Sequence, residues 1–194
     1  MEILIASHNH HKIKEFRQLF EPMLIDVVSL SDIDEFDEVV ESGKTFLENA
    51  LLKAEYFCKK HHRITIADDS GLVIEALDGD PGVNSSRYSG KGDKKNNEKV
   101  LKLMEGKKNR KAAFVCVIAL MLPDGKTYHV EGVVEGLITY SPRGNNGFGY
   151  DPIFLHEPYG KTFAELHPDL KNKVSHRALA LQKLKELFYE VVNN

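Results

Sequence analysis

The segment from Ala112 to Leu122 constrains the fold most, because its residues are nearly all apolar on both alternating faces of a strand. Such a strand must be covered on both sides, which favours a central place in a sheet with helices on either face. Pro123-Asp124-Gly125 is turn chemistry, and Thr127 to Ile138 is expected to return as the partner strand of a long hairpin.

The N-terminal part of the chain predicts a strand followed by a helix. Ile3 to Ala6 is a short apolar run typical of a buried strand, and Ser7-His8-Asn9 has the polar residues that cap helices. Apolar residues then recur at helical spacing, at Ile13, Phe16 and Phe20.

Four further segments are expected to form a loop and three helices. Ser31 to Glu41 is acidic and is expected to be a surface loop with a short strand. Thr45 and Glu48 form a capping-box pattern before a second helix, on which Asn49 and Lys53 share a face away from the apolar one. More helices are expected from Asp93 to Glu105 and from about Ser175. The fold class is therefore α/β, with a long central mixed sheet and flanking helices.

Composition excludes several classes of function. The formal net charge of −3 argues against a general nucleic-acid binder, which gains affinity by neutralising phosphates. No apolar run approaches the roughly 20 residues that span a bilayer, and the N-terminus does not resemble a secretory signal. The two cysteines, Cys58 and Cys116, have no metal-ligand spacing and fit a reducing compartment. We expect a cytoplasmic protein with no nucleic-acid or membrane partner.

The acidic segment Asp68-Asp69-Ser70-Gly71 gives the clearest chemical signal. It follows the apolar run Ile64 to Ala67, so we expect the two carboxylates at a strand end, before a glycine turn. Adjacent carboxylates repel one another, and a hard divalent cation with oxygen ligands, Mg²⁺ above all, relieves that repulsion. A helix cap or Asx-turn is the alternative. Glu41 is a candidate third carboxylate.

Scattered basic residues form a second candidate group, which a triphosphate would need around its oxygens. Lys12 lies in the first turn after a strand, where helix amides attract anions. Lys53 stands on the second helix, and the stretch that immediately precedes and opens the last helix supplies Lys171, His176 and Arg177. Each alone is more typical of a solvated surface residue.

The glycine-rich segment from Gly144 to Asp151 is a candidate base-binding loop. Its glycines match neither a Rossmann nor a P-loop spacing. Phe148 stands between two glycines with little nearby to pack on, which suits stacking on a base, and Asp151 could accept a hydrogen bond from the base edge. The alternative is a loop with a core phenylalanine.

Taken in order, these segments resemble the inosine triphosphate pyrophosphatase family, the HAM1-like non-canonical purine NTP pyrophosphatases, over nearly the whole chain. The resemblance rests on Ser7 to Lys12, Glu41 to Phe46, Glu48-Asn49-Ala50, Lys53-Ala54, Ala67 to Leu72, Pro81-Gly82-Val83, Ser86-Arg87-Tyr88, Gly147 to Phe154, Lys171-Asn172 and Ser175-His176-Arg177. It implies a single domain, residues 1–194, of two lobes around a substrate cleft, a homodimer, and Mg²⁺-dependent hydrolysis of ITP, dITP and XTP to the monophosphate and pyrophosphate.

The resemblance also implies roles for individual residues. Glu41 and Asp69 would serve the metal, with Asp69 as the proton acceptor for water, and the sequence leaves open whether Asp69 is the base, a metal ligand or both. The matching substrate-binding positions are Ser7, His8, Asn9, His10, His11, Lys12, Lys53, Ser70, Phe148, Gly149, Tyr150, Asp151, Lys171, His176 and Arg177. His8 departs from the family pattern, which usually has a small residue there.

Two rival functions remain open on the sequence. A Maf-type pyrophosphatase for pyrimidine nucleotides has a related fold, although Phe148 to Asp151 and Ser175 to Arg177 argue against it. A non-catalytic nucleotide sensor would explain the glycine loop and the basic residues, but not the carboxylates, which disfavour a triphosphate unless a metal is present.

Overall fold

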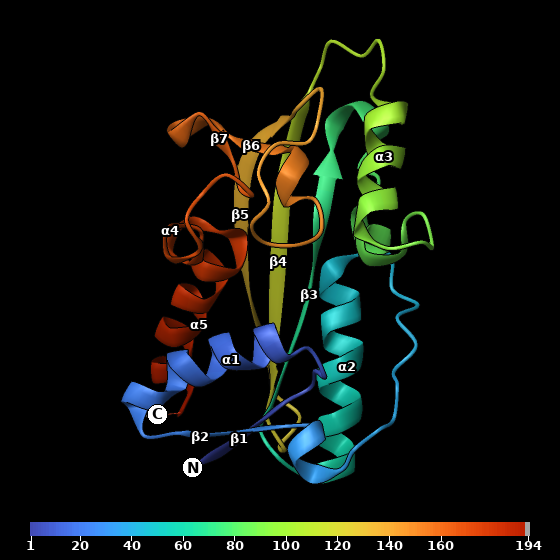
Figure 1. Cartoon of the computed structure of the whole chain (residues 1–194). Helices are drawn as coiled ribbons and strands as arrows, with labels where there is room; N and C mark the ends of the chain where they lie inside the picture. The colour runs from blue at the N-terminus through green and yellow to red at the C-terminus, as the bar shows by residue number, and fades with distance from the viewer. Residues whose placement is uncertain (193–194) are drawn as a thin grey trace. The chain divides into compact units, whose positions relative to one another are not determined.

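Seven strands within residues 1–192, the part of the chain that the computed structural model describes, form one sheet in the order β2-β1-β3-β4-β5-β6-β7 (Figure 1). β1 is parallel to β2 and β3, whereas β6 is antiparallel to β5 and β7, so the predicted mixed sheet is confirmed. The strands are β1 (Glu2–Ile5), β2 (Asp26–Ser29), β3 (Thr65–Ile74), β4 (Lys111–Met121), β5 (Thr127–Ile138), β6 (Phe154–His156) and β7 (Lys161–Thr162).

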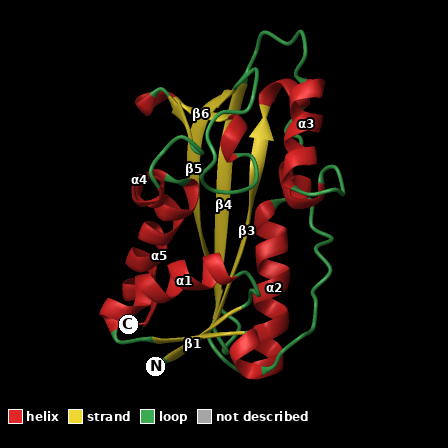
Figure 2. Cartoon of the chain, viewed as in Figure 1, coloured by secondary structure: helices red, strands yellow, loops and turns green. Residues whose placement is uncertain are grey.

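Helices flank this sheet, as Figure 2 shows in red. They are α1 (His10–Phe20), α2 (Phe46–His61), α3 (Asp93–Leu103), α4 (Pro168–Val174) and α5 (His176–Val192). The chain divides into two compact units. Unit 1 comprises Met1–Asp69, Val117–Gly132 and Ala180–Asn194, and unit 2 comprises Ser70–Cys116 and Val133–Leu179. That the whole chain is a single domain of two lobes stays a prediction.

Unit 1 is built around β1 and α1. The side chains of Ile3 to Ile5 are fully buried, and α1 buries the predicted face of Ile13, Phe16 and Phe20. Phe20 meets Phe188 edge to face, with ring centroids 5.1 Å apart. Both the predicted strand and the predicted helix are confirmed.

Unit 2 has an aromatic core centred on β4. Phe114 packs on Phe154 and Phe163, with ring centroids 4.6 and 5.7 Å away. Val100 and Met104 bring α3 onto the same cluster. This side-chain cluster fixes the places of β6 and β7, which are too short to be recognised in the sequence.

The strand containing the acidic pair runs further than predicted. Asp68, Asp69 and Gly71 lie inside β3, not at a strand end before a turn, because β3 continues to Ile74. Burial drives this: Leu72 and Ile74 are fully buried, so the chain stays extended through Gly71.

One smaller prediction was also wrong. Residues 31–41 contain no strand, and the short strand lies earlier, at Asp26–Ser29, where it extends the sheet beside β1. The last helix begins close to the predicted Ser175, and Lys171 precedes it, in the separate helix α4, which ends before Ser175 takes extended backbone angles.

Candidate active site

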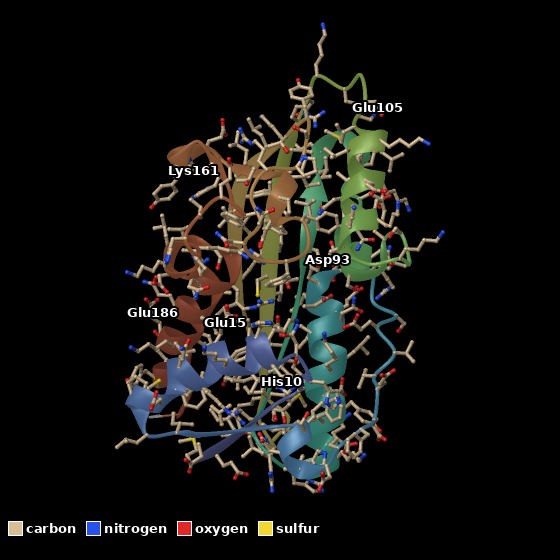
Figure 3. All side chains as sticks on the ribbon, in the orientation of Figure 1. His10, Glu15, Asp93, Glu105, Lys161 and Glu186 are labelled. Atoms are coloured by element: carbon tan, nitrogen blue, oxygen red, sulfur yellow. The ribbon has the colours of Figure 1, made fainter. Side chains whose placement is uncertain are left out.

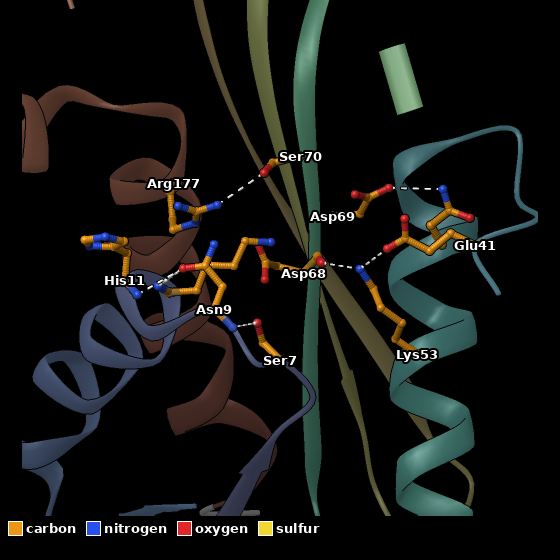
Figure 4. A network of polar contacts seen from close by, with 11 residues as sticks. Ser7, Asn9, His11, Glu41, Lys53, Asp68, Asp69, Ser70 and Arg177 are labelled. Atoms are coloured by element: carbon orange, nitrogen blue, oxygen red, sulfur yellow. Dashed lines mark hydrogen bonds and ion pairs between the residues drawn. The ribbon is translucent and has the colours of Figure 1, made fainter. Parts of the chain in front are cut away.

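The two carboxylates of β3 serve different helices. Successive side chains of a strand point to opposite faces, so Asp68 and Asp69 diverge. Asp68 Oδ2 lies 2.9 Å from Lys12 Nζ on α1, whereas Asp69 Oδ2 accepts a hydrogen bond of 3.1 Å from Asn49 Nδ2 on α2 (Figure 4). Both are nearly buried, at 2% and 9% exposure. A fully extended strand thus presents one acid to each neighbouring helix.

Lys53 joins the acidic strand to the loop before α2. Its Nζ donates to Glu41 Oε1 at 2.7 Å and to the carbonyl oxygen of Asp68 at 2.8 Å. Asn49 and Lys53 are one helical turn apart, so the shared face predicted for them is the one that meets β3. This brings Glu41, Lys53 and Asp68 together in unit 1.

Asn49 fixes the position of the loop that carries Glu41. Its Oδ1 accepts from the Gly43 amide at 2.8 Å while its Nδ2 holds Asp69. The side chain is fully buried. A Cβ at Gly43 would lie 2.6 Å from Asn49 Oδ1, so only glycine allows this approach. The spacing of Asn49 and Lys53 predicts their shared face, but no pattern in the sequence predicts the partners of Asn49.

Burial raises the pKa of the Asp69 carboxyl, because removal from water disfavours its charged form. The charge of Lys53 and the hydrogen bond from Asn49 act in the opposite direction, and Glu41 adds to the rise. A carboxylate in this state is a better proton acceptor than an exposed aspartate, and a divalent cation beside it would favour its charged form.

The turn before α1 is held by its own side chains. Asn9 Oδ1 caps the helix by accepting from the amides of His11 and Lys12, at 3.0 and 3.3 Å, and Ser7 Oγ accepts from the Asn9 amide at 3.1 Å. These two helix amides are therefore engaged, which corrects the expectation that they are open to an anion. The Lys12 side chain, rather than the helix amides, is the cation offered here.

His8, the residue of this turn that departs from the family pattern, is exposed, and its Nδ1 lies 3.3 Å from Ser31 Oγ. His10 and His11 are exposed as well. The imidazole of His8 is therefore accommodated outside the core of unit 1, toward the residues that follow β2.

A pocket of about 290 Å³ in unit 1 is lined by several of the charged side chains described above. The residues that matter for its chemistry are Ser7, His8, Lys12, Glu41, Lys53 and Asp68. Within residues 1–192 no three His, Cys, Asp or Glu side chains form a metal-ligand cluster. A divalent cation such as Mg²⁺ is commonly held by one or two carboxylates together with substrate phosphates and water, so a site of this kind does not need three protein ligands, and Glu41 and Asp69 could hold one.

In unit 2 the glycine loop presents Phe148. The residue is 54% exposed, and Lys171 Nζ lies 4.8 Å from the centroid of its ring. Lys171 also forms an ion pair with the buried Asp151 carboxylate, whose pKa is raised chiefly by burial and lowered by Lys171. A Cβ at Gly147 would collide with that carboxylate. Phe148, Asp151 and Lys171 therefore meet at one place, and the alternative of a core phenylalanine is excluded by the exposure of Phe148.

Tyr150 faces the other way. Its ring is 3% exposed, and its hydroxyl donates to the Ser85 carbonyl at 2.8 Å. Gly149 has a left-handed backbone, with φ of +61°, which suits glycine. The side chain of Tyr150 thus anchors the loop within unit 2, and its predicted contact with substrate stays a prediction.

The start of α5 supplies the remaining predicted residues of unit 2. Arg177 is 5% exposed and donates to Ser70 Oγ at 3.2 Å. His176 stacks on Phe114, with ring centroids 4.7 Å apart. Ser70 and Arg177 are far apart in the sequence, and no local pattern predicts their contact.

The fold is an α/β fold with a mixed sheet. Its unit 1 carries a site in which Lys12 is paired with Asp68 and Lys53 with Glu41. The family model described as the Ham1 family matches residues 3–187, and the chain belongs to that family. It is 51% identical over 190 residues to the dITP/XTP pyrophosphatase of Bacillus subtilis (strain 168), with 96% of each chain covered.

Solved structures agree with this assignment. The Staphylococcus aureus Ham1 protein has a TM-score of 0.92 and 43% identity, covering 98% of this chain and 99% of its own. A HAM1 protein from Coxiella burnetii has a TM-score of 0.94 and 42% identity, covering 98% of this chain and all of that one. None of the helices in residues 1–192 is both long and apolar enough to span a membrane.

Proposed function

We propose that this chain hydrolyses the α–β phosphoanhydride bond of dITP, XTP and ITP, releasing the nucleoside monophosphate and pyrophosphate and so removing non-standard purine nucleotides from the cell's pool. Relatives that are about half identical to it are named dITP/XTP pyrophosphatases. The observation that carries the proposal is the pocket in unit 1 where Lys12 and Lys53 stand beside Glu41 and Asp68.

Lys12 and Lys53 bind the phosphates in this proposal, with Ser7 to His11 forming the turn beside them. Their ion pairs with Asp68 and Glu41 hold both ammonium groups in place before substrate arrives. Mg²⁺ would be held by Glu41 and Asp69, and when bound it would neutralise charge on the triphosphate. A sensor that binds nucleotide without metal has no use for these carboxylates, which would repel the phosphates.

Asp69 takes the proton of the attacking water as the water adds to the α-phosphorus and pyrophosphate leaves. Its burial supports this assignment, because a raised pKa makes the carboxylate a stronger proton acceptor. Asn49 orients the acceptor by holding Oδ2. The two lysines stabilise negative charge on the phosphate oxygens as it develops.

Unit 2 reads the purine. Phe148 stacks on the base, Lys171 and Asp151 act at its edge, and Gly149 and Tyr150 shape the loop. His176 and Arg177 are our candidates for donors to the 6-oxo group, with Ser70 beside Arg177. Adenine offers an amine there, and a mismatch that leaves buried polar groups unpaired can discriminate by roughly 10⁴-fold or more.

We further propose that the enzyme is a homodimer and works in the cytoplasm. Cys58 and Cys116 are both buried thiols, as suits a reducing compartment. Size-exclusion chromatography with light scattering tests the first point, with a single peak at the monomer mass against it. Cell fractionation with an antibody tests the second.

The deciding experiment measures pyrophosphate release from dITP, XTP, ITP, GTP, ATP, dTTP and UTP, with and without Mg²⁺. We expect turnover of the first three that requires the metal. Preference for dTTP or UTP would favour a pyrimidine pyrophosphatase. Nucleotide binding with no pyrophosphate at any metal concentration would favour a sensor and refute the proposal.

A further inference from the structure

Phe148 is a large aromatic side chain, exposed on a loop whose backbone is fixed by several hydrogen bonds. More than half of its surface faces solvent. Its amide donates to Asp151 Oδ2 at 2.9 Å, and its carbonyl oxygen accepts from the Asp151 amide at 3.3 Å. An exposed apolar ring contributes little to folding, so fixing the backbone at Phe148 does little for stability. The arrangement instead suits a ring held ready to contact a ligand.

The next residue, Gly149, is held from α3. Its amide donates to Asp93 Oδ2 at 2.7 Å, and its carbonyl oxygen accepts from Asn97 Nδ2 at 3.0 Å. Asp93 and Asn97 are four residues apart and so share a helix face; Figure 3 shows Asp93 at the beginning of α3. We call Asp93 and Asn97 the α3 clamp.

The α3 helix is itself anchored next to the clamp. Asn96 is 1% exposed, and its side chain accepts from the Ser89 amide at 2.7 Å and donates to the carbonyl oxygens of Ser85 and Ser86. The adjacent side-chain amides of Asn96 and Asn97 thus have separate partners, one fixing the helix and the other holding the loop. Because Asn96 anchors α3, the hydrogen bonds from the α3 clamp hold Gly149 in a fixed position.

The clamp is not explained by packing. Asn97 is 7% exposed, and its Oδ1 is buried with no hydrogen-bond partner among the described residues, which disfavours folding. A pocket of about 420 Å³ lies along the glycine loop, lined in part by Asp93, Asn97, Asn145, Gly147 and Phe148. The loop thus has room to move, and the two side-chain bonds from α3 hold it.

We propose that Asp93 and Asn97 are positioning residues that set how tightly the enzyme binds the purine base, by holding Gly149 so that the neighbouring Phe148 is ready to stack. The inference rests on the proposed function for the role of Phe148. Its consequence is specific: losing the clamp weakens nucleotide binding and leaves the phosphate chemistry of unit 1 intact.

The test compares Asp93→Ala, Asn97→Asp and the conservative Asp93→Asn, with Lys102→Ala on the exposed side of α3 as control. Immobilising a loop before binding contributes roughly three- to tenfold in affinity. We expect KM for dITP to rise by about that factor in Asp93→Ala and Asn97→Asp, with kcat nearly unchanged, as for loss of uniform binding. Asp93→Asn keeps an acceptor oxygen and should restore most of the affinity.

A second readout reports the loop directly. The chain contains no tryptophan, so Phe148→Trp adds a single fluorophore at the loop. Its steady-state anisotropy without nucleotide should fall when Asp93→Ala is added and stay unchanged with Lys102→Ala, because loop motion on the nanosecond scale depolarises emission.

The outcomes separate the clamp from the proposed function. Unchanged KM and anisotropy in Asp93→Ala would overturn the clamp, as would a fall in kcat that matches a loss of folded protein and is not restored by Asp93→Asn. If the parent protein does not turn over dITP, the proposed function fails. The Kd of dITP, measured by fluorescence quenching in the Phe148→Trp background, then replaces KM, and an unchanged Kd on adding Asp93→Ala refutes the inference.

Discussion

Replacing Gly43 by alanine tests how the position of Glu41 depends on α2. The added Cβ would lie 2.6 Å from Asn49 Oδ1 and 2.7 Å from Glu48 Cβ, each about 0.7 to 0.8 Å short of an ordinary 3.4 Å contact. Both neighbours sit on the first turns of a helix, and Asn49 is fully buried, so the loop must move instead. The Gly43 amide would then lose Asn49 Oδ1 as its acceptor.

The magnitude follows from that displacement. Overpacking of this kind destabilises by about 1–3 kcal/mol, so the variant should still fold. A shift of about 1 Å in a catalytic group can lower turnover by about 100-fold. For a somewhat smaller shift we expect kcat/KM for dITP to fall by roughly 10- to 100-fold, and the Mg²⁺ concentration for half-maximal rate to rise.

The assay is pyrophosphate release from dITP over a range of Mg²⁺ concentrations, with urea unfolding to measure stability. Ser42→Ala is the matched control, because Ser42 is the exposed neighbour in the same loop. Normal turnover and an unchanged Mg²⁺ dependence in Gly43→Ala would show that the loop need not sit as described, and the role assigned to Glu41 would lose its support.

Three further changes test other parts of the molecule. Asp69→Asn should lower kcat by at least ~10² at saturating Mg²⁺, the usual size of a general-base contribution; near-normal turnover would remove Asp69 from catalysis. Arg177→Ala should weaken use of ITP more than of ATP in steady-state kinetics, and an equal effect on both would exclude base reading by Arg177. Burial lowers the pKa of His156 below 6.5, so the folded state favours the neutral imidazole. The contribution of the neutral His156 to the free energy of unfolding is therefore complete above about pH 6.5 and is lost as pH falls through the pKa of the folded state. His156→Leu should therefore flatten the fall in unfolding free energy between pH 7 and 5 measured with urea, and an unchanged slope would contradict this.

Elements with a long periodic pattern could be predicted from the sequence. β5 has the bounds expected, Thr127–Ile138, and the capping box of Thr45 and Glu48 begins α2 as predicted. β6 and β7 could not be found, because three and two residues carry no periodicity. Gly71 was misleading for another reason: glycine usually indicates a turn, but the buried residues beyond it keep β3 extended.

Part of the candidate site, like part of the fold, could be predicted from the sequence. The residue types and their segments could be identified, because carboxylates after an apolar run and lysines near helix starts are local patterns. Their partners could not. Nothing in the sequence pairs Lys12 with Asp68 or Arg177 with Ser70, since those contacts depend on how strands and helices come together. Asn97 and Gly149 likewise meet only in the folded chain.

Because Asp68 and Asp69 point to opposite faces of β3, the site depends on the register of this strand. Each acid reaches its helix only because its position in the strand is odd or even. One extra residue between Thr65 and Asp68, if the strand before it kept its register, would turn the first acid toward α2 and the second toward α1. Single-residue insertions and deletions should therefore be excluded from the first half of β3, even where every side chain of the site is retained.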